Sequence, residues 1–198
     1  MAKSKDEGFP ITLNSLDDIM DTVLNAKRIV FLTGSLGYDD GPENAAEVSY
    51  IAKKLEYLAH LSNEPIKFII NSPVGDVFEG LLLYDTIQGI VKSGIKVVTE
   101  ARGLAASMGC ILLQAGSERT ATRHSRLLIH EVSSVAYGKS SEMEEQVEET
   151  KRVNDMMKRI LAEKTGMTSD QIEKLWHKKD VWLSSDDALK MKLIDRIV

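Results

Sequence analysis

Short apolar segments alternate with amphipathic segments along the chain. The apolar segments place β-branched and aliphatic residues over four or five positions, as buried strands do, and the amphipathic ones repeat apolar residues every three or four positions, as helices do. The predicted strands are Arg28–Leu32, Ile66–Ile70, Ile95–Thr99 and Arg126–Ile129, and the predicted helices are Leu16–Asn25, one that begins at Pro42, Val77–Val91 and Ala105–Gln114. This alternation predicts an α/β fold in which crossover helices connect a parallel sheet.

A longer, highly charged segment predicts a different kind of helix over about residues 139–165. Ser141 and Glu144 form a capping-box pattern at its start, and Gly166 is the expected stop. One narrow seam runs along this helix in alternating steps of four and three residues: Met143, Val147, Thr150, Asn154, Met157 and Leu161. A seam this narrow suits packing against another helix, either in a second subunit or within the same chain.

Composition narrows the class of protein. The chain has 198 residues with 25 basic and 30 acidic side chains, a net charge of −5, which disfavours nucleic-acid binding. Cys110 is the only cysteine, so no intrachain disulfide can form. No apolar run approaches the roughly 20 residues that span a bilayer, and no signal-peptide core is visible. We therefore expect a cytoplasmic protein without membrane contact, with a tail over residues 1–14 and a single domain over 15–198.

Candidate chemistry begins at the serine in Gly103–Gly109 (GLAASMG). Ser107 lies among small residues, between a predicted strand and an apolar helix. Small neighbours let a substrate backbone approach, and a helix N-terminus offers N–H groups to a developing oxyanion. A serine at a helix start is more often a cap than a nucleophile, so this motif alone is weak. Cys110, the other candidate nucleophile, falls on the apolar helix and is expected in the core.

A nucleophilic serine needs a base, and His130 is the best-placed of the four histidines. It ends the apolar strand Arg126–Ile129, and catalytic groups gather at the carboxyl ends of parallel strands. His60, His124 and His177 lie in polar or amphipathic surroundings and are expected on the surface. A histidine at a strand end can equally be structural, so the pattern favours this role without fixing it.

The acid that orients the histidine is less well determined. Asp180 precedes a short apolar run and lies where a cleft rim is expected. Asp186 and Asp187 resemble first-turn helix residues, and Asp195 stays open as a competitor. Glu131 adjoins the histidine, but neighbours along a strand point to opposite faces.

Backbone donors for an oxyanion are expected at Gly75 and Met108. The first lies in the turn after a predicted strand, and the second follows Ser107 directly. An ordinary strand-to-helix turn is the alternative interpretation of the first position. We expect neither a metal nor a cofactor, because the sequence has no Cys/His cluster with metal-ligand spacing and no phosphate- or dinucleotide-binding glycine motif.

Four stretches, in order, resemble motifs of the ClpP family. The match runs from about Arg28 to Val198, so four individually weak motifs become specific together. The stretches are Phe68–Gln88 around the substrate-binding strand and oxyanion loop, Gly103–Gly109 around the nucleophile, Arg126–His130 (RLLIH) with the histidine, and Lys179–Leu183 (KDVWL) with Leu193–Asp195 in the C-terminal block that carries the aspartate.

The resemblance implies a ClpP/crotonase-type fold with residues 139–165 as a protruding handle helix. It implies a serine endopeptidase that cleaves unfolded polypeptides, with Ser107 as nucleophile, His130 as base and Asp180 as orienting acid. Gly75 and Met108 would supply the oxyanion-hole N–H groups. The family forms heptameric rings that stack into a tetradecamer, and an AAA+ Clp ATPase unfoldase feeds substrates into the chamber; we expect the same partners here.

Departures from the family pattern mark a divergent member. Val74 and Asp76 flank the oxyanion glycine, and the carboxylate is expected to oppose oxyanion formation. Lys178–Lys179 replaces a pair associated with ring-to-ring contact, and Lys192 stands where the family prefers glycine. Two other functions stay open at this point: a non-catalytic ring subunit that assembles with an active paralogue, and an acyl-CoA hydratase or lyase of the crotonase type.

Overall fold

The computed structural model describes residues 15–37 and 42–198. The predicted tail over residues 1–14 lies outside the described residues. The strands are β1 Ile29–Thr33, β2 Ile66–Ser72, β3 Val97–Ala106, β4 Glu118–Ala121, β5 Arg126–Ile129, β6 Val181–Ser184 and β7 Arg196–Ile197. The helices are α1 Leu16–Ala26, α2 Pro42–Leu61, α3 Val77–Lys92, α4 Met108–Leu113, α5 Ser140–Thr165, α6 Ser169–Trp176 and α7 Ser185–Lys190.

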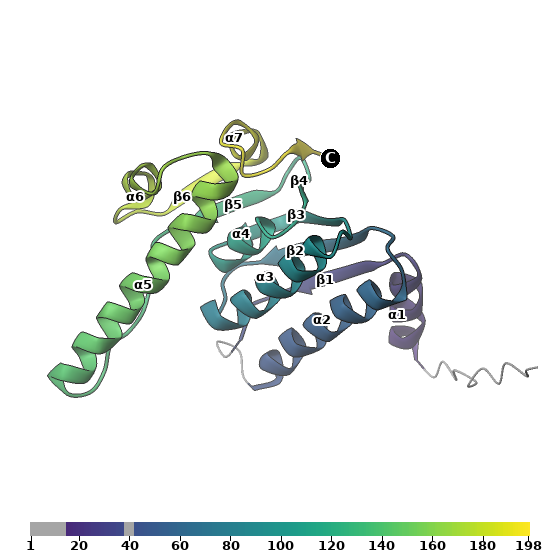
Figure 1. Ribbon diagram of the computed structural model, residues 1–198, viewed down its shortest axis with the longest axis horizontal. Helices are drawn as coiled ribbons and strands as arrows, with labels where there is room; N and C mark the ends of the chain where they lie inside the picture. The colour runs from purple at the N-terminus through teal and green to yellow at the C-terminus, as the bar shows by residue number, and fades with distance from the viewer. Residues whose placement is uncertain (1–14, 38–41) are drawn as a thin grey trace, which may run out of the picture.

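The strands form one mostly parallel sheet that branches at β3. The order β1-β2-β3-β4-β7 is parallel throughout, and the last residues of β3 also pair in parallel with β5 (Figure 1). β6 pairs antiparallel with β5, which makes it the exception among the described strands. The predicted α/β fold with a mostly parallel sheet is confirmed. The branch matters for function because the end of β5 lies beside the turn that follows β3.

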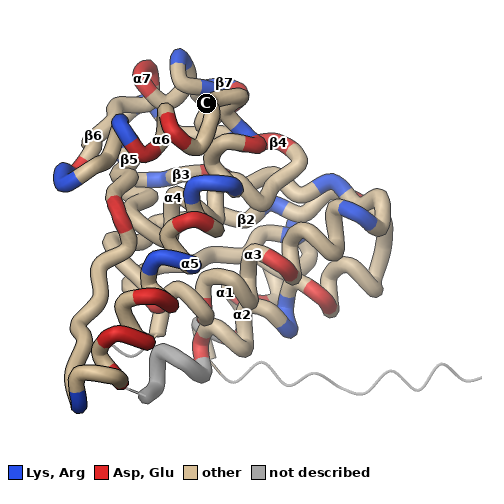
Figure 2. Tube along the Cα trace, turned by 60° about the vertical axis from the view of Figure 1, so that its left-hand side comes forward, with Lys and Arg blue, Asp and Glu red and all other residues tan. Residues whose placement is uncertain are grey.

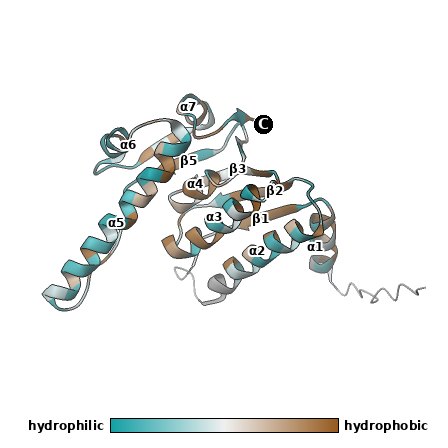
Figure 3. Ribbon diagram, in the orientation of Figure 1, coloured by the Kyte–Doolittle hydropathy of each residue, from teal (hydrophilic) through white to brown (hydrophobic). Residues whose placement is uncertain are grey.

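The core lies between the sheet and the helices α2, α3 and α4. Figure 1 shows these helices side by side across β1–β3, and Figure 3 shows that α3 and α4 are largely apolar, whereas α2 also carries many hydrophilic residues. The predicted apolar stripe of α2 is buried, with Leu55 and Leu58 fully shielded from solvent, and Phe68 of β2 is fully buried as well. Apolar burial of this kind stabilises by about 25 cal/mol per Å², so the repeating apolar spacing is what seats each helix.

β3 is twice as long as the predicted strand, and this prediction was wrong. We expected Ile95–Thr99 to end before a helix over Ala105–Gln114, whereas β3 runs for ten residues and α4 has only six. The pairing of β2 with β3 shifts register between Ile70 and Ser72, which leaves extra residues in β3. Gly103 lies at this bulge with a φ of 90°. A glycine at this position of the sequence suggested a loop, whereas it serves a bulge within the strand.

The side chain of Asn71 fills the bulge. Its Oδ1 accepts a hydrogen bond of 3.1 Å from the backbone N–H of Leu104. A Cβ on Gly103 would lie 2.8 Å from the same Oδ1, so a glycine is needed there for close approach as well as for its backbone angle. The bulge thus has its own hydrogen bond, and it sets the path of the chain toward Ser107.

The long helix α5 divides into two halves with different surroundings. It begins at Ser140, and Glu142 accepts from the backbone N–H of Lys139, so the cap predicted at Ser141 was wrong. Gly166 ends it with a φ of 76°, as predicted. In the C-terminal half Val153, Met157, Ile160 and Leu161 are buried, whereas Met143 and Val147 in the N-terminal half are exposed.

This division supports the intrachain alternative for one half of the seam. The C-terminal half packs within the chain, and the N-terminal half projects away from it as a largely hydrophilic helix (Figure 3). Ion pairs three residues apart cover the projecting part, such as Lys151 with Glu148 and Arg152 with Glu149. Figure 2 shows basic and acidic residues interspersed along the described chain.

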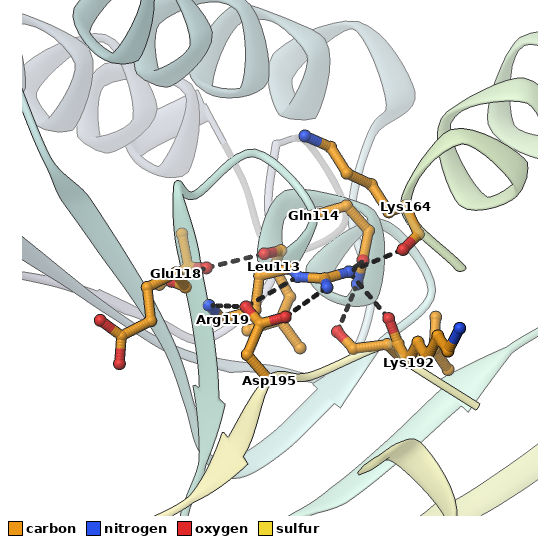
Figure 4. A network of polar contacts seen from close by, with 9 residues as sticks. Leu113, Gln114, Glu118, Arg119, Lys164, Lys192 and Asp195 are labelled. Carbon is orange, nitrogen blue, oxygen red and sulfur yellow. Dashed lines mark hydrogen bonds and ion pairs between the residues drawn. The ribbon is translucent and has the colours of Figure 1, made fainter. Parts of the chain in front are cut away.

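A buried arginine ties the C-terminal segment to the rest of the fold (Figure 4). Arg119 of β4 contacts both carboxylate oxygens of Asp195, at 2.6 and 3.2 Å, and its Nη1 donates to Gln114 Oε1 and to the carbonyl oxygen of Lys192. A bidentate pair of this kind is among the stronger polar contacts. The arginine therefore joins β4, α4 and the chain after α7.

Lys192 adopts the left-handed conformation that its position after α7 requires. Its φ is 58°, and the N–H of Leu193 donates to Ala188 across the end of the helix. This is the hydrogen-bond pattern of a Schellman cap, which favours glycine at the left-handed residue. A lysine there costs about 1 kcal/mol.

None of the helices in residues 15–37 and 42–198 is long and apolar enough to cross a bilayer.

Candidate active site

Ser107 occupies a strained turn between β3 and α4. Its φ of 54° and ψ of −120° are unusual for a residue with a side chain. Its N–H donates to Leu128 of β5 at 2.9 Å, so the turn is fastened to the neighbouring strand. The side chain makes no capping hydrogen bond to α4, which removes the ordinary explanation of a serine at a helix start. A strained turn that presents an uncommitted hydroxyl is the arrangement of a nucleophile.

His130 follows β5 directly and is the least exposed of the four histidines. His60, His124 and His177 are all exposed, as expected. β3 and β5 are parallel, and Ala106 pairs with Leu128, so Ser107 and His130 both follow the same edge of the sheet. Both residues line one pocket. The sequence located the end of β5 correctly, whereas β3 runs on to Ala106, seven residues beyond its predicted end at Thr99.

Asp180 and His130 both lie just beyond the antiparallel pair of β5 and β6. Ile129 pairs with Val181 at the last rung of this ladder, so the two residues flank the same end of it. Asp180 is not among the residues that line the pocket. Asp180 is exposed, and its side chain makes no hydrogen bond or ion pair with the described residues.

The competing aspartates are occupied elsewhere. Asp195 accepts from Arg119, and Asp186 forms an exposed ion pair with Arg123. Asp187 caps α7, because its carboxylate accepts from the N–H and the hydroxyl of Ser184. Asp186 and Asp187 are in the first turn of a helix, as predicted. Of the four aspartates weighed from the sequence, Asp180 is the one whose side chain has no partner among the described residues.

The pocket beside Ser107 has a volume of about 70 Å³ and is lined by both apolar and polar residues. Within the described residues, the side chains of Ser107, His130 and Asp180 make no hydrogen bonds with one another. Catalytic hydrogen bonds are often long before substrate binds and tighten in the complex, so this arrangement is compatible with a triad that closes on its substrate. The pocket is lined by Val74, Gly75, Val77, Ser107, Met108, Ile111, Ile129, His130, Glu131, Val132, Ser133, Met157 and Trp176.

Gly75 and Met108 both line this pocket, as the candidate oxyanion donors should. The N–H of Leu36 donates to Val74, and the N–H of Asp76 donates to Leu36, so the extended loop is fastened on one side. Backbone groups alternate in direction along an extended chain. The N–H of Gly75 therefore points away from Leu36, and it makes no hydrogen bond with the described residues.

A glycine at position 75 is required by close packing and not by its backbone angle. Its φ is not positive, so an ordinary residue could adopt the same conformation. A Cβ on Gly75 would instead lie 2.4 Å from the Cβ of Leu36. The glycine permits close approach of two loops, and that approach fastens the backbone whose N–H faces the pocket.

Asp76 caps α3. Its Oδ1 accepts from the backbone N–H groups of Phe78 and Glu79, at 2.8 and 3.0 Å. The N-terminus of a helix stabilises a negative charge, so the carboxylate has a structural role that the sequence did not suggest. Val74 lies on the other side of Gly75, and its side chain lines the pocket.

A groove continues from the pocket along the base of α5. It has a volume of about 340 Å³ and runs between the loop at Gly75–Phe78 and the segment Val132–Val135. The N–H of Val132 donates to Asn154 of α5, and the hydroxyl of Ser134 contacts that of Thr150. Beyond the segment, the N–H of Tyr137 donates to Gln146. The backbone groups of residues 133–136 make no hydrogen bond with the described residues.

Other reactive groups offer weaker chemistry. Burial raises the pKa of Cys110 to about 12, so its thiol stays protonated and it is a core residue, as expected. Glu131, Glu173 and His177 place potential ligand atoms within 4.8 Å of one another. Lys158 already lies 2.9 Å from Glu173, and the hydrogen bond from this ammonium lowers the pKa of that carboxyl. A metal would have to compete with this cation.

Sequence reasoning missed part of the pocket wall. Trp176 ends α6 and Met157 belongs to α5, and both are buried against the site. The apolar pair Ile172 and Trp176, four residues apart, was a signal for the buried face of α6. Nothing in the sequence indicated that this face meets the pocket, because the contact joins segments far apart in the chain.

Comparison with known proteins places the chain in a family. The sequence model described as Clp protease matches residues 13–198. The chain is 41% identical over 180 residues to the ATP-dependent Clp protease proteolytic subunit 3 of Synechococcus sp. (strain CC9902), covering 89% of this chain and 85% of that protein. It is 40% identical over 180 residues, with the same coverage, to proteolytic subunit 2 of Prochlorococcus marinus (strain NATL2A). The chain belongs to the Clp protease family.

Proposed function

We propose that this protein is a Clp-type serine endopeptidase whose nucleophile is Ser107. The observation that carries the proposal is the strained turn at Ser107, whose side chain caps nothing and shares a pocket with His130 and two candidate backbone donors. His130 acts as base and Asp180 orients it. The family match and the relatives' names support hydrolysis of peptide bonds over the hydratase alternative.

The residues have distinct roles in the reaction. His130 takes the proton from the Ser107 hydroxyl as its oxygen attacks the peptide carbonyl carbon. The N–H groups of Gly75 and Met108 stabilise the oxyanion. His130 then gives the proton to the leaving amine, and the acyl-enzyme is hydrolysed by a water that the same histidine activates. Asp180 stabilises the histidine when it is charged.

The groove along Val132–Val135 suits an extended polypeptide. Unpaired backbone N–H and C=O groups of the groove can pair with the backbone of a substrate strand. This pairing does not depend on the substrate's side chains, so the groove can bind many sequences. The groove meets the pocket at Gly75, Val77 and Val132, which line both. A peptide bound along it reaches Ser107 without any rearrangement of the sheet. A substrate must lie along the groove as an extended segment, which favours unfolded polypeptide over a folded domain.

The protein works as a cytoplasmic ring assembly. Heptameric rings that stack into a tetradecamer, with an AAA+ Clp ATPase as unfoldase, follow from the family resemblance. The exposed N-terminal half of α5, with Met143 and Val147, supports a contact between subunits. The relatives' names include both "ATP-dependent" and "subunit", which supports a larger machine.

Hydrolysis by matched serine variants tests this function. The assay follows cleavage of a fluorogenic peptide and of an unfolded protein by the purified oligomer. Ser107→Ala is expected to abolish both activities, whereas Ser133→Ala, at a serine that lines the same pocket, retains most of them. A Ser107→Ala protein that cleaves as fast as the parent would refute the assignment. A correctly assembled parent with no activity would favour the non-catalytic ring subunit.

A further inference from the structure

Trp176 contains a buried hydrogen-bond donor that the protein leaves without an acceptor. The residue is 1% exposed, and its indole Nε1 has no hydrogen-bond partner. In the described part of the chain one other buried side-chain atom shares this condition, Oδ1 of Asn25, and it lines none of the pockets beside the site. Buried polar groups are nearly always paired, so the unpaired indole N–H calls for an explanation.

Trp176 is one of the residues that line the pocket beside Ser107, and its indole Nε1 is buried just behind the accessible surface. A pocket next to the nucleophile receives the side chain on the acyl side of the scissile bond, so this inference rests on the proposed function. Met108 and Met157 line the same pocket. Unbranched thioether side chains adapt their shape easily, so the pocket can open toward the indole nitrogen as a side chain enters.

A carboxylate lies in the same wall. Glu131 lines the pocket, and its Oε1 accepts from the backbone N–H of Lys178. His177 Nδ1 lies 3.4 Å from the same oxygen, whereas the other carboxylate oxygen, Oε2, has no partner among the described residues and can accept a hydrogen bond. The site therefore combines one buried N–H donor without an acceptor and one carboxylate oxygen without a donor, beside Ile111, Ile129 and Met157.

We propose that this pocket selects glutamine on the acyl side of the cleaved bond. The two methylene groups of glutamine fit the apolar wall, its amide oxygen accepts from Trp176 Nε1, and its amide NH₂ donates to Glu131. Glutamate is disfavoured because two carboxylates would repel. Lysine offers no acceptor to the indole, and norleucine leaves the indole N–H unpaired.

The experiment compares peptides that differ only at this residue. The values of kcat/KM for glutamine and norleucine peptides are measured with the assembled parent, Trp176→Phe and Trp182→Phe. Loss of the indole donor is expected to lower the glutamine-to-norleucine ratio about three- to tenfold in Trp176→Phe. Trp182 is half-exposed on β6 and does not line the pocket, so Trp182→Phe should keep the parent's ratio. Equal ratios in all three proteins would overturn the proposal.

A second measurement does not require Trp176→Phe to fold. It records NMR spectra of Ser107→Ala, which is expected to bind peptides without cleaving them. The indole N–H resonance of Trp176, assigned by its persistence in a Trp182→Phe background, should move downfield with the glutamine peptide and not with the norleucine peptide. The same shift with both peptides would contradict the proposal. Cleavage of the peptides that survives Ser107→Ala would instead refute the active site itself, so the two failures are distinguishable.

Discussion

Ile129 and Val181 face each other at the last rung of the antiparallel pair β5–β6. The residues just beyond them, His130 and Asp180, come from segments 50 positions apart in the sequence, yet the register sets them at the same end of this pair. β6 is the antiparallel strand of an otherwise parallel sheet. Because β6 runs antiparallel to β5, Asp180, which precedes β6, lies near the carboxyl end of β5.

This register predicts a specific effect of removing the charge at Asp180. Asp180→Asn should lower kcat by about 100-fold or more, since the amide no longer stabilises the charged histidine. Asp186→Asn is the control, because Asp186 pairs with Arg123 on the surface. The measurement is steady-state peptide hydrolysis with the assembled proteins. Equal losses in the two variants, or no loss in Asp180→Asn, would show that the register does not act in catalysis.

The position of Asp76 changes what we expect of the oxyanion loop. The sequence suggested that its charge weakens the oxyanion hole, so that Asp76→Ser would raise turnover. Because the carboxylate caps α3, we now predict that Asp76→Ser keeps both the cap and kcat within about twofold, and that Asp76→Ala lowers the free energy of unfolding by about 1 kcal/mol. Urea unfolding and kcat are measured together. A large rise of kcat in Asp76→Ser would restore the original interpretation.

The two halves of α5 should respond differently to substitution. Val147→Glu places a charge on the exposed half and should shift sedimentation toward smaller species, with subunit secondary structure unchanged. Leu161→Ala leaves a cavity beneath the buried half of α5 and should lower the free energy of unfolding by about 3 kcal/mol. Arg152→Glu controls for added negative charge, since Arg152 is exposed on a different face of the helix. Unchanged sedimentation of Val147→Glu would show that the exposed half makes no subunit contact.

The pair of Arg119 and Asp195 predicts a pH dependence of stability. Burial acts to raise the pKa of Asp195, but hydrogen bonds from the guanidinium and backbone N–H of Arg119 outweigh it and keep that pKa below its ordinary value. A lowered folded-state pKa gives stability that is complete above the unfolded pKa of about 4 and is lost as pH falls through the folded value.

Asp195→Asn should therefore lower the free energy of unfolding by about 1 to 2 kcal/mol at pH 7, and the difference from the parent should shrink below about pH 4. Asp186→Asn is the matched control, because exposed ion pairs contribute little. Chemical unfolding at pH 7 and pH 3.5 gives both differences. A deficit of Asp195→Asn that grows as the pH falls would contradict the lowered pKa.

Much of the fold was predictable because it depends on local periodicity. The apolar stripe of α2 and the strand Arg126–Ile129 have signals within a few residues, and both are confirmed. Ser107 and His130 were chosen as candidates because each was expected to follow a strand, and both do so. The length of β3 was missed because Gly103 serves a bulge filled by Asn71 from another strand, and no local pattern reports that partner.

The roles of aspartates and of the pocket wall depend on contacts between distant segments. Asp195 could not be separated from Asp180 by spacing, because its partner Arg119 lies 76 residues away. Trp176 was visible as an apolar residue of a helix, but its position beside Ser107 follows from how α6 packs on α5. Such relationships need the three-dimensional structure.

The most direct test of the account is to find which serine a fluorophosphonate modifies. The probe reacts with a serine activated by a base and an oxyanion hole, and mass spectrometry locates the modified residue. The account predicts modification at Ser107 in the assembled protein and none in Ser107→Ala or His130→Ala, with Ser133→Ala labelled as the parent is. Modification of Ser133 instead, or no modification of a correctly assembled oligomer from pH 6 to 9, would contradict it.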